Sequence, residues 1–211
     1  MNIGRIQSVF LFILLSALIV MFWAKGDVEK NNPEAVIEIA QSDEVRIRTL
    51  KDPIDQAADR VTKKSFGTYV TPKNSPVQPE KFTGYHTGTD FETFADEANV
   101  DVSVYAICEG KILQKKTAAG YGGVLVQSCY INHQPLTVVY GHLNLKSIAK
   151  INGEVLLAGE TIGILGQPPL ETDRERKHLH LSIHKGMGID IRGYVTTQPA
   201  LTAWIDFETL K

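Results

Sequence analysis

Histidine is absent from the first 85 residues of this 211-residue chain, and all six histidines lie between His86 and His184. Cysteine is also scarce: two residues are too few for a disulfide-built mini-protein or a cysteine-rich zinc site. No run of lysine and arginine stands out and the formal net charge is −2, which argues against nucleic acid as a partner. There is no GxGxxG, Walker or Gly-x-Ser-x-Gly motif.

Near its start, the sequence has one long uncharged run, residues 6–24, between Arg5 and Lys25. As a helix it would span about 28 Å, close to the roughly 30 Å hydrocarbon core of a bilayer. We expect residues 1–25 to form an uncleaved signal anchor that holds the chain in the cytoplasmic membrane, with the bulk exported. A cleaved signal peptide with Ala24 at the last position is the alternative, although Phe22 suits the −3 position poorly. A buried soluble helix is a third interpretation.

Residues 26–65 are polar and mixed, and we interpret them as a stalk that ends in a short helix. Asp52 suits the N-cap of that helix and Pro53 its first position. The apolar residues that would share one face and pack on the next domain are Ile54, Ala57, Ala58 and Val61. A fully flexible stalk of this length would average roughly 35 Å between its ends.

The composition of the sequence changes at about residue 66. Short runs rich in Val, Ile, Leu, Thr and Tyr alternate with glycine or asparagine turns, as in 101–107, 123–131 and 136–143. This spacing predicts an all-β, antiparallel domain over residues 66–211.

Two histidines of this domain, His178 and His180, are spaced to point to the same face of a strand. They suit a metal or catalytic pair, although a solvated polar face of an edge strand is the other interpretation. His86 and Asp90 flank a glycine in a predicted loop, and imidazole nitrogen and carboxylate oxygen both suit zinc. His86, Asp90 and His180 together would leave a fourth tetrahedral position for water, as in a catalytic zinc site.

No His-Glu-x-x-His motif supplies a general base. His142 and His178 are the spare histidines, and neutral imidazoles suit that role near pH 7. We expect His133 to be a surface turn residue and His184 to lie beyond the centre.

Several motifs in order resemble the LytM- and lysostaphin-like zinc metallopeptidases, a family of peptidoglycan endopeptidases. The stretches that carry the resemblance are GYHTGTDF (84–91), AICEGKI (106–112), GYGGVLV (120–126), VVYGHL (138–143), GEVLLAGETIGILG (153–166) and HLHLSI (178–183). The resemblance implies a small antiparallel β-sheet domain of the duplicated hybrid motif type. It also implies one Zn²⁺ per chain on His86, Asp90 and His180, with His142 and His178 as catalytic histidines.

The expected function is therefore a membrane-anchored zinc endopeptidase that hydrolyses peptide bonds of peptidoglycan, in stem-peptide cross-links or bridges, outside the cytoplasmic membrane. The alternatives are a non-catalytic relative that binds and activates cell-wall amidases, and a metal-binding sensor. Protein partners are not predicted. One departure from the family is the long charged stretch 167–181 before the paired histidines, which we interpret as a wall of the groove or as an ordinary solvated loop.

The two cysteines fall in consecutive predicted strands, with a Thr-Ala-Ala-Gly turn near their midpoint at 118–119. Opposed strand positions bring β-carbons close enough for a disulfide, and an exported domain meets oxidising conditions. The sequence predicts a Cys108–Cys129 bridge; two buried thiols in a slipped register are the alternative.

Overall fold

A computed structural model describes residues 50–211. The expected signal anchor and most of the expected stalk lie outside the described residues. Within 50–211, no helix has the length and apolar character needed to cross a bilayer.

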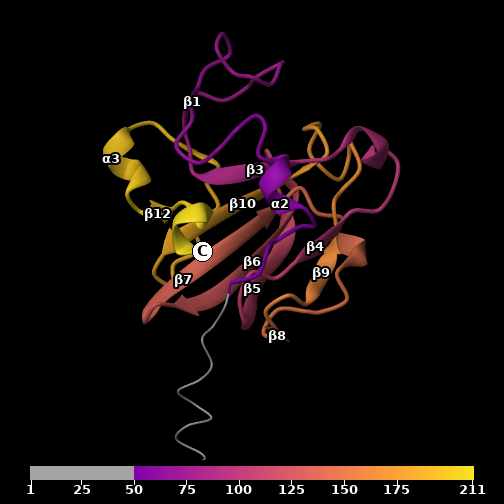
Figure 1. Ribbon diagram of the computed structural model, residues 1–211, viewed down its shortest axis with the longest axis vertical. Helices are drawn as coiled ribbons and strands as arrows, with labels where there is room; N and C mark the ends of the chain where they lie inside the picture. The colour runs from indigo at the N-terminus through magenta and orange to yellow at the C-terminus, as the bar shows by residue number, and fades with distance from the viewer. Residues whose placement is uncertain (1–49) are drawn as a thin grey trace, which may run out of the picture. The chain divides into compact units, whose positions relative to one another are not determined.

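The described chain is mostly β, and all its strand pairs are antiparallel, as the sequence predicts (Figure 1). The elements in chain order are α2 (Ala57–Arg60), β1 (Tyr69–Val70), β2 (Gly84–His86), β3 (Gly88–Glu92), η1 (Ala95–Glu97), β4 (Ser103–Tyr105), β5 (Gly110–Ala118), β6 (Gly122–Ile131), β7 (Gln134–Gly141), η2 (Leu145–Ser147), β8 (Val155–Leu156), β9 (Thr161–Ile164), β10 (His178–Lys185), β11 (Tyr194–Val195), α3 (Gln198–Leu201), β12 (Trp204–Ile205) and η3 (Phe207–Leu210).

The main sheet has seven strands, in the order β12-β10-β7-β6-β5-β8, with β3 also paired to β10. Two smaller sheets, β1-β2-β11 and β4-β9, complete the fold. Strand β10 has neighbours along both edges, because β7 lies on one side and β3 and β12 lie on the other. A strand enclosed in this way holds its side chains in a fixed register, which is what a multi-residue site requires.

The core follows the period-two pattern of the strands. On β10, Leu179, Leu181 and Ile183 enter the large buried cluster. His178 and His180 alternate with them and take the opposite face, as predicted. The sequence pattern of β10 therefore separates a structural face from a chemical face.

The predicted helix near residue 52 is shorter than expected and begins later. Helix α2 spans only Ala57–Arg60, and the residue before it, Gln56, has a left-handed φ of 54°. The segment at the expected start is not helical, and there the carbonyl of Pro53 accepts a hydrogen bond from Tyr105 N at 2.8 Å. Asp52 does not cap the helix and instead pairs with Lys211 at 2.7 Å.

Residues 50–65, the expected end of the stalk, belong to the same compact unit as the sheet. Ile54 and Ala57 are buried in the large core cluster, whereas Ala58 is exposed. Arg60 is buried as well, and its guanidinium forms two hydrogen bonds of 2.6 and 2.7 Å with the carboxylate of Glu97. This segment is thus a structural part of the domain that follows it.

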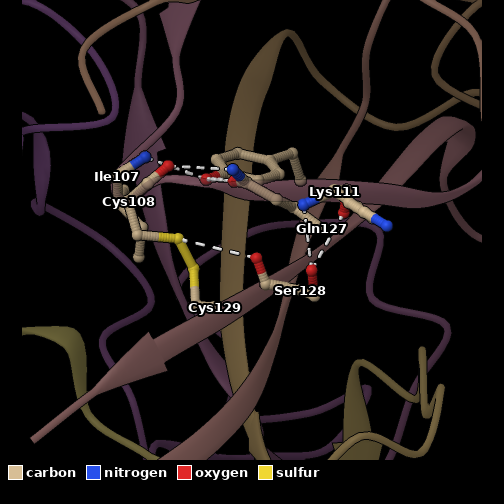
Figure 2. Close-up of a disulfide and its surroundings, with 7 residues drawn as sticks. Ile107, Cys108, Lys111, Gln127, Ser128 and Cys129 are labelled. Carbon is tan, nitrogen blue, oxygen red and sulfur yellow. Dashed lines mark hydrogen bonds between the residues drawn. A yellow bond between two sulfur atoms is a disulfide. The ribbon is translucent and has the colours of Figure 1, made fainter. Parts of the chain in front are cut away.

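Cys108 and Cys129 form a disulfide with 6.1 Å between their Cα atoms (Figure 2). Its surroundings differ from the prediction, because Cys108 lies in the bend between β4 and β5 rather than in a strand. The β5–β6 hairpin turns at residues 119–121, slightly later than predicted, since Ala118 pairs with Gly122. The bridge therefore ties a bend to β6 instead of joining opposed strand positions.

Candidate metal centre and active site

The pairing of β3 with β10 assembles two of the three predicted metal ligands. His180 lies opposite Asp90, and His178 lies opposite Glu92. Gly88 permits this close pairing, because a Cβ built on it would lie 2.4 Å from the carbonyl oxygen of Leu181. The glycine between His86 and Asp90 therefore allows the backbones of β3 and β10 to approach closely.

His86 ends β2 and completes the group. Its Nε2 lies 3.0 Å from Nδ1 of His180 and 3.3 Å from Oδ1 of Asp90, and the last two atoms are 3.0 Å apart. All three residues are at least 97% buried. A tetrahedral zinc ion with bonds of about 2.0–2.1 Å separates its ligand atoms by about 3.3 Å. The geometry of this cluster therefore fits a metal ion.

The tautomer of His86 also fits this role. Its Nδ1 lies 3.2 Å from the carbonyl oxygen of Ser65, which can only accept a hydrogen bond. Nδ1 therefore carries the proton, and the lone pair of Nε2 points toward Asp90 and His180. Such a hydrogen bond from the second ring nitrogen is the usual outer support of a metal-bound histidine.

The backbone before β1 supports the second ligand in the same way. Asp90 N donates to the carbonyl of Lys64 at 2.9 Å. The buried ammonium of Lys64 pairs with Glu80 at 2.6 Å and donates to the hydroxyl of Tyr194 at 2.9 Å. The main-chain oxygens of residues 64 and 65 thus contact Asp90 and His86, respectively. Every residue has a main-chain oxygen, so the side-chain identities at these two positions could not predict the contacts.

Electrostatics keep the centre in a ligating state. Burial alone would raise the pKa of Asp90, but His86 and His178 outweigh it and hold that pKa well below its ordinary value. Burial lowers the pKa of His180 to about 4, against the opposing effect of Asp90. Near neutral pH, the cluster presents one carboxylate and a neutral imidazole from His180.

The two predicted catalytic histidines lie beside this group. The rings of His142 and His178 are 4.2 Å apart between centroids. Nδ1 of His178 donates to the carbonyl of Arg176 at 2.9 Å, so its Nε2 presents a lone pair. Burial, with a smaller contribution from the neighbouring His178, holds the pKa of His142 well below its ordinary value. The ring of His142 is therefore neutral near pH 7.

All five predicted site residues line one pocket of about 340 Å³. Glu175 and Arg176 also line it, which favours the groove-wall interpretation of the charged stretch at these two positions. Within the same stretch, Asp173 instead accepts a hydrogen bond from Gly120 N, and Lys177 donates to backbone carbonyls. The stretch therefore combines pocket-lining residues with structural ones.

Several pocket residues were not predicted from the sequence, among them Lys64, Tyr121 and Tyr194. The ring of Tyr121 lies between those of His142 and His180, at 5.4 and 5.3 Å. Its hydroxyl is buried and has no hydrogen-bond partner among residues 50–211. The sequence feature that could have indicated Tyr121 as a site residue is an aromatic side chain within a glycine-rich turn.

The remaining predicted histidines are not in the pocket. His133 is exposed, in a turn, with a φ of 61°. His184 lies further along β10 and packs edge-on against Trp204, with 5.0 Å between ring centroids.

Three of the solved structures that match this chain are the following. CbpA from L. salivarius REN is 21% identical, with a TM-score of 0.50, and the match covers 77% of this chain and 94% of that one. The catalytic domain of lysostaphin from Staphylococcus simulans is 20% identical (TM-score 0.48), with coverage of 72% and 99%. A zinc-containing peptidase from Vibrio cholerae is 23% identical (TM-score 0.43), with coverage of 69% and 41%.

A search of curated proteins gave no match. The sequence model of one family, peptidase family M23, matches residues 84–192, more than half of the chain. This span contains His86, Asp90, His142, His178 and His180. The chain therefore belongs to peptidase family M23, the LytM- and lysostaphin-like family that its histidine motifs resemble.

Proposed function

We propose that this protein is a zinc metalloendopeptidase that hydrolyses peptide bonds in peptidoglycan. The observation that carries the proposal is the buried cluster of His86, Asp90 and His180, whose ligand atoms lie at tetrahedral separations in a pocket with two further histidines. Membership of the M23 family supports the reaction class and the substrate class.

His86, Asp90 and His180 would hold the ion through Nε2, Oδ1 and Nδ1. When bound, zinc supplies Lewis-acid polarisation of the scissile carbonyl and makes water nucleophilic near neutral pH. In the proposed mechanism, Nε2 of His178 takes the proton of the attacking water, because the bond from Nδ1 to Arg176 leaves that nitrogen basic. His142 orients the water or donates to the developing oxyanion.

We further propose that residues 6–24 anchor the chain in the cytoplasmic membrane, with the peptidase domain on the outer side. The disulfide supports an oxidising compartment, since such bonds are rare in reducing cytosol. Membrane fractionation of the 23.3 kDa chain, with access of external protease to the domain, tests the placement. A soluble product that starts near residue 25 would contradict the anchor.

The proposed reaction is tested by zinc content and hydrolysis of purified peptidoglycan, measured on the same samples. His86→Ala, Asp90→Ala and His180→Ala should lose zinc and hydrolysis together, because a three-ligand site tolerates no loss. His142→Ala and His178→Ala should keep about one zinc per chain and lose roughly 10²–10⁴ in rate, as expected for general acid–base groups.

His133→Ala is the matched control, because that histidine is exposed in a turn and should leave both readouts unchanged. Loss of zinc in His178→Ala would move His178 into the ligand set. Full hydrolysis in both His142→Ala and His178→Ala would refute the mechanism. Zinc without any hydrolysis in the unaltered protein, together with amidase binding, would favour the non-catalytic alternative.

A further inference from the structure

Arg176 lies two residues before β10, in the charged stretch that departs from the family pattern. Its Nε lies 3.0 and 2.9 Å from the two carboxylate oxygens of Glu92, and its Nη2 bonds Glu92 as well. The same Nη2 lies 2.8 Å from Oδ2 of Asp90. The side chain is only 18% exposed, so this contact takes place largely out of water.

The strand period explains why these residues meet. Asp90 and Glu92 are two residues apart on β3, and they lie opposite His180 and His178 on β10. Side chains two residues apart share a face of the sheet. Arg176 precedes His178 by the same interval, so the two carboxylates of β3 come within reach of its guanidinium.

The two oxygens of Asp90 have different partners. Oδ1 faces His86 and His180, at 3.3 and 3.0 Å. Oδ2 accepts the hydrogen bond from Arg176 at 2.8 Å and lies 3.4 Å from Nε2 of His178. A carboxylate can bind a metal through one oxygen or through both, and here the second oxygen is already bonded to a fixed donor.

A purely electrostatic role does not explain a cation at this position. A guanidinium close to a metal site repels the ion, whereas a planar, forked donor fixes a carboxylate in one orientation. Glu92 neutralises the guanidinium and fixes its plane through two contacts to Nε. The main chain of Arg176 contributes separately, because its carbonyl accepts the hydrogen bond from Nδ1 of His178.

We infer that Arg176 is a positioning residue: held by Glu92, its guanidinium keeps Asp90 as a one-oxygen metal ligand. The inference uses the metal centre of the proposed function but not its reaction. Its test therefore measures binding of Zn²⁺ and Co²⁺ to the full chain by chelator competition, with hydrolysis recorded separately.

Arg176→Met should bind Zn²⁺ about 10–100-fold more weakly, as outer-shell losses do. Arg176→Lys keeps the charge but loses the fork, and it should also bind more weakly. Glu92→Gln releases the guanidinium and should weaken binding too. The double variant Arg176→Met/Glu92→Gln should have a Zn²⁺ affinity no lower than that of the single variant with the lower affinity, because the two residues act as one unit.

Arg192→Met is the control, because Arg192 also lines the pocket but its side chain pairs with Asp190 rather than with a predicted metal ligand. Its Zn²⁺ affinity should be unchanged. With Co²⁺, Arg176→Met should show weaker visible absorption than the unaltered protein and Arg192→Met, because release of Oδ2 permits two-oxygen binding and a higher coordination number. Circular dichroism of each variant verifies the fold.

Unchanged or tighter Zn²⁺ binding by a folded Arg176→Met protein would overturn the inference, since a role by charge alone predicts tighter binding. Unchanged binding by Arg176→Lys would overturn the role of the fork. The two proposals fail separately. Absence of hydrolysis by the unaltered protein, with Arg176-dependent metal affinity, would refute the peptidase alone; hydrolysis with Arg176-independent affinity would refute this inference alone.

Discussion

Replacing Tyr140 with phenylalanine removes one buried oxygen atom and leaves two buried polar groups without their hydrogen-bond partner. The hydroxyl of Tyr140 accepts from Ile107 N at 2.9 Å and donates to Oε1 of Gln127 at 2.8 Å. Nε2 of Gln127 is tied to the carbonyl of Cys108 at 2.8 Å, so the amide cannot turn to another partner without breaking that bond (Figure 2). Both side chains are fully buried.

Each buried group left without a partner costs about 1–3 kcal/mol. Tyr140→Phe should therefore lower the free energy of unfolding by about 2–6 kcal/mol, with the ring packing kept. Urea denaturation at pH 7, followed by circular dichroism, measures the loss. Combined with Gln127→Leu, the loss should be less than the sum of the two single losses, because both variants remove the same hydroxyl–amide bond.

Tyr121→Phe is the matched control. Its hydroxyl is also buried but has no partner among the described residues, so its removal leaves no group unpaired and should not lower the free energy of unfolding. A loss below about 1 kcal/mol in Tyr140→Phe, or an equal loss in both variants, would refute this account of the buried network.

Three further outcomes are expected. The double variant Cys108→Ser/Cys129→Ser should lose about 3 kcal/mol of unfolding free energy, given the 21-residue separation, and a loss near zero in non-reducing denaturation would contradict this. Gly88→Ala should lower the free energy of unfolding by about 1–3 kcal/mol and weaken zinc binding, because the new Cβ would lie 2.9 Å from the ring of His180. Full zinc content by elemental analysis would contradict the predicted loss of zinc. The hydrogen bonds from Arg60 lower the pKa of Glu97 below 4.5, so the stability it contributes is complete above about pH 4.5 and is lost as the pH falls through the folded-state pKa. The stability difference between the unaltered protein and Glu97→Gln should therefore shrink in urea titrations below pH 4.5, and a difference independent of pH would exclude this linkage.

The sequence predicted the features that depend on residue type and short spacing. The His-x-His interval placed His178 and His180 on one face because a strand has a period of two. The antiparallel β class followed from the same alternation, and the resemblance of the motifs pointed to the family. These predictions needed only local geometry.

The features that were missed depend on atoms that side-chain identity does not reveal. The carbonyls of Lys64 and Ser65 contact two ligands, and any residue at these positions has a carbonyl. The late start of α2 is a similar case, since the non-helical segment before it contacts Tyr105 through the main-chain carbonyl of Pro53. Glu92 is different: it lies two residues from Asp90 on β3, so the strand period was sufficient to predict its place beside the site.

The support of the predicted metal ligands by residues 64 and 65 limits how far the chain can be shortened from its N-terminal side. The segment that matches the family begins at residue 84, and a recombinant fragment cut there would keep every histidine of the site. It would also leave the ring nitrogen of His86 and the amide of Asp90 without the acceptors that orient them. A minimal zinc-binding fragment should therefore start before residue 64, and shorter ones should bind zinc poorly despite containing the complete motif.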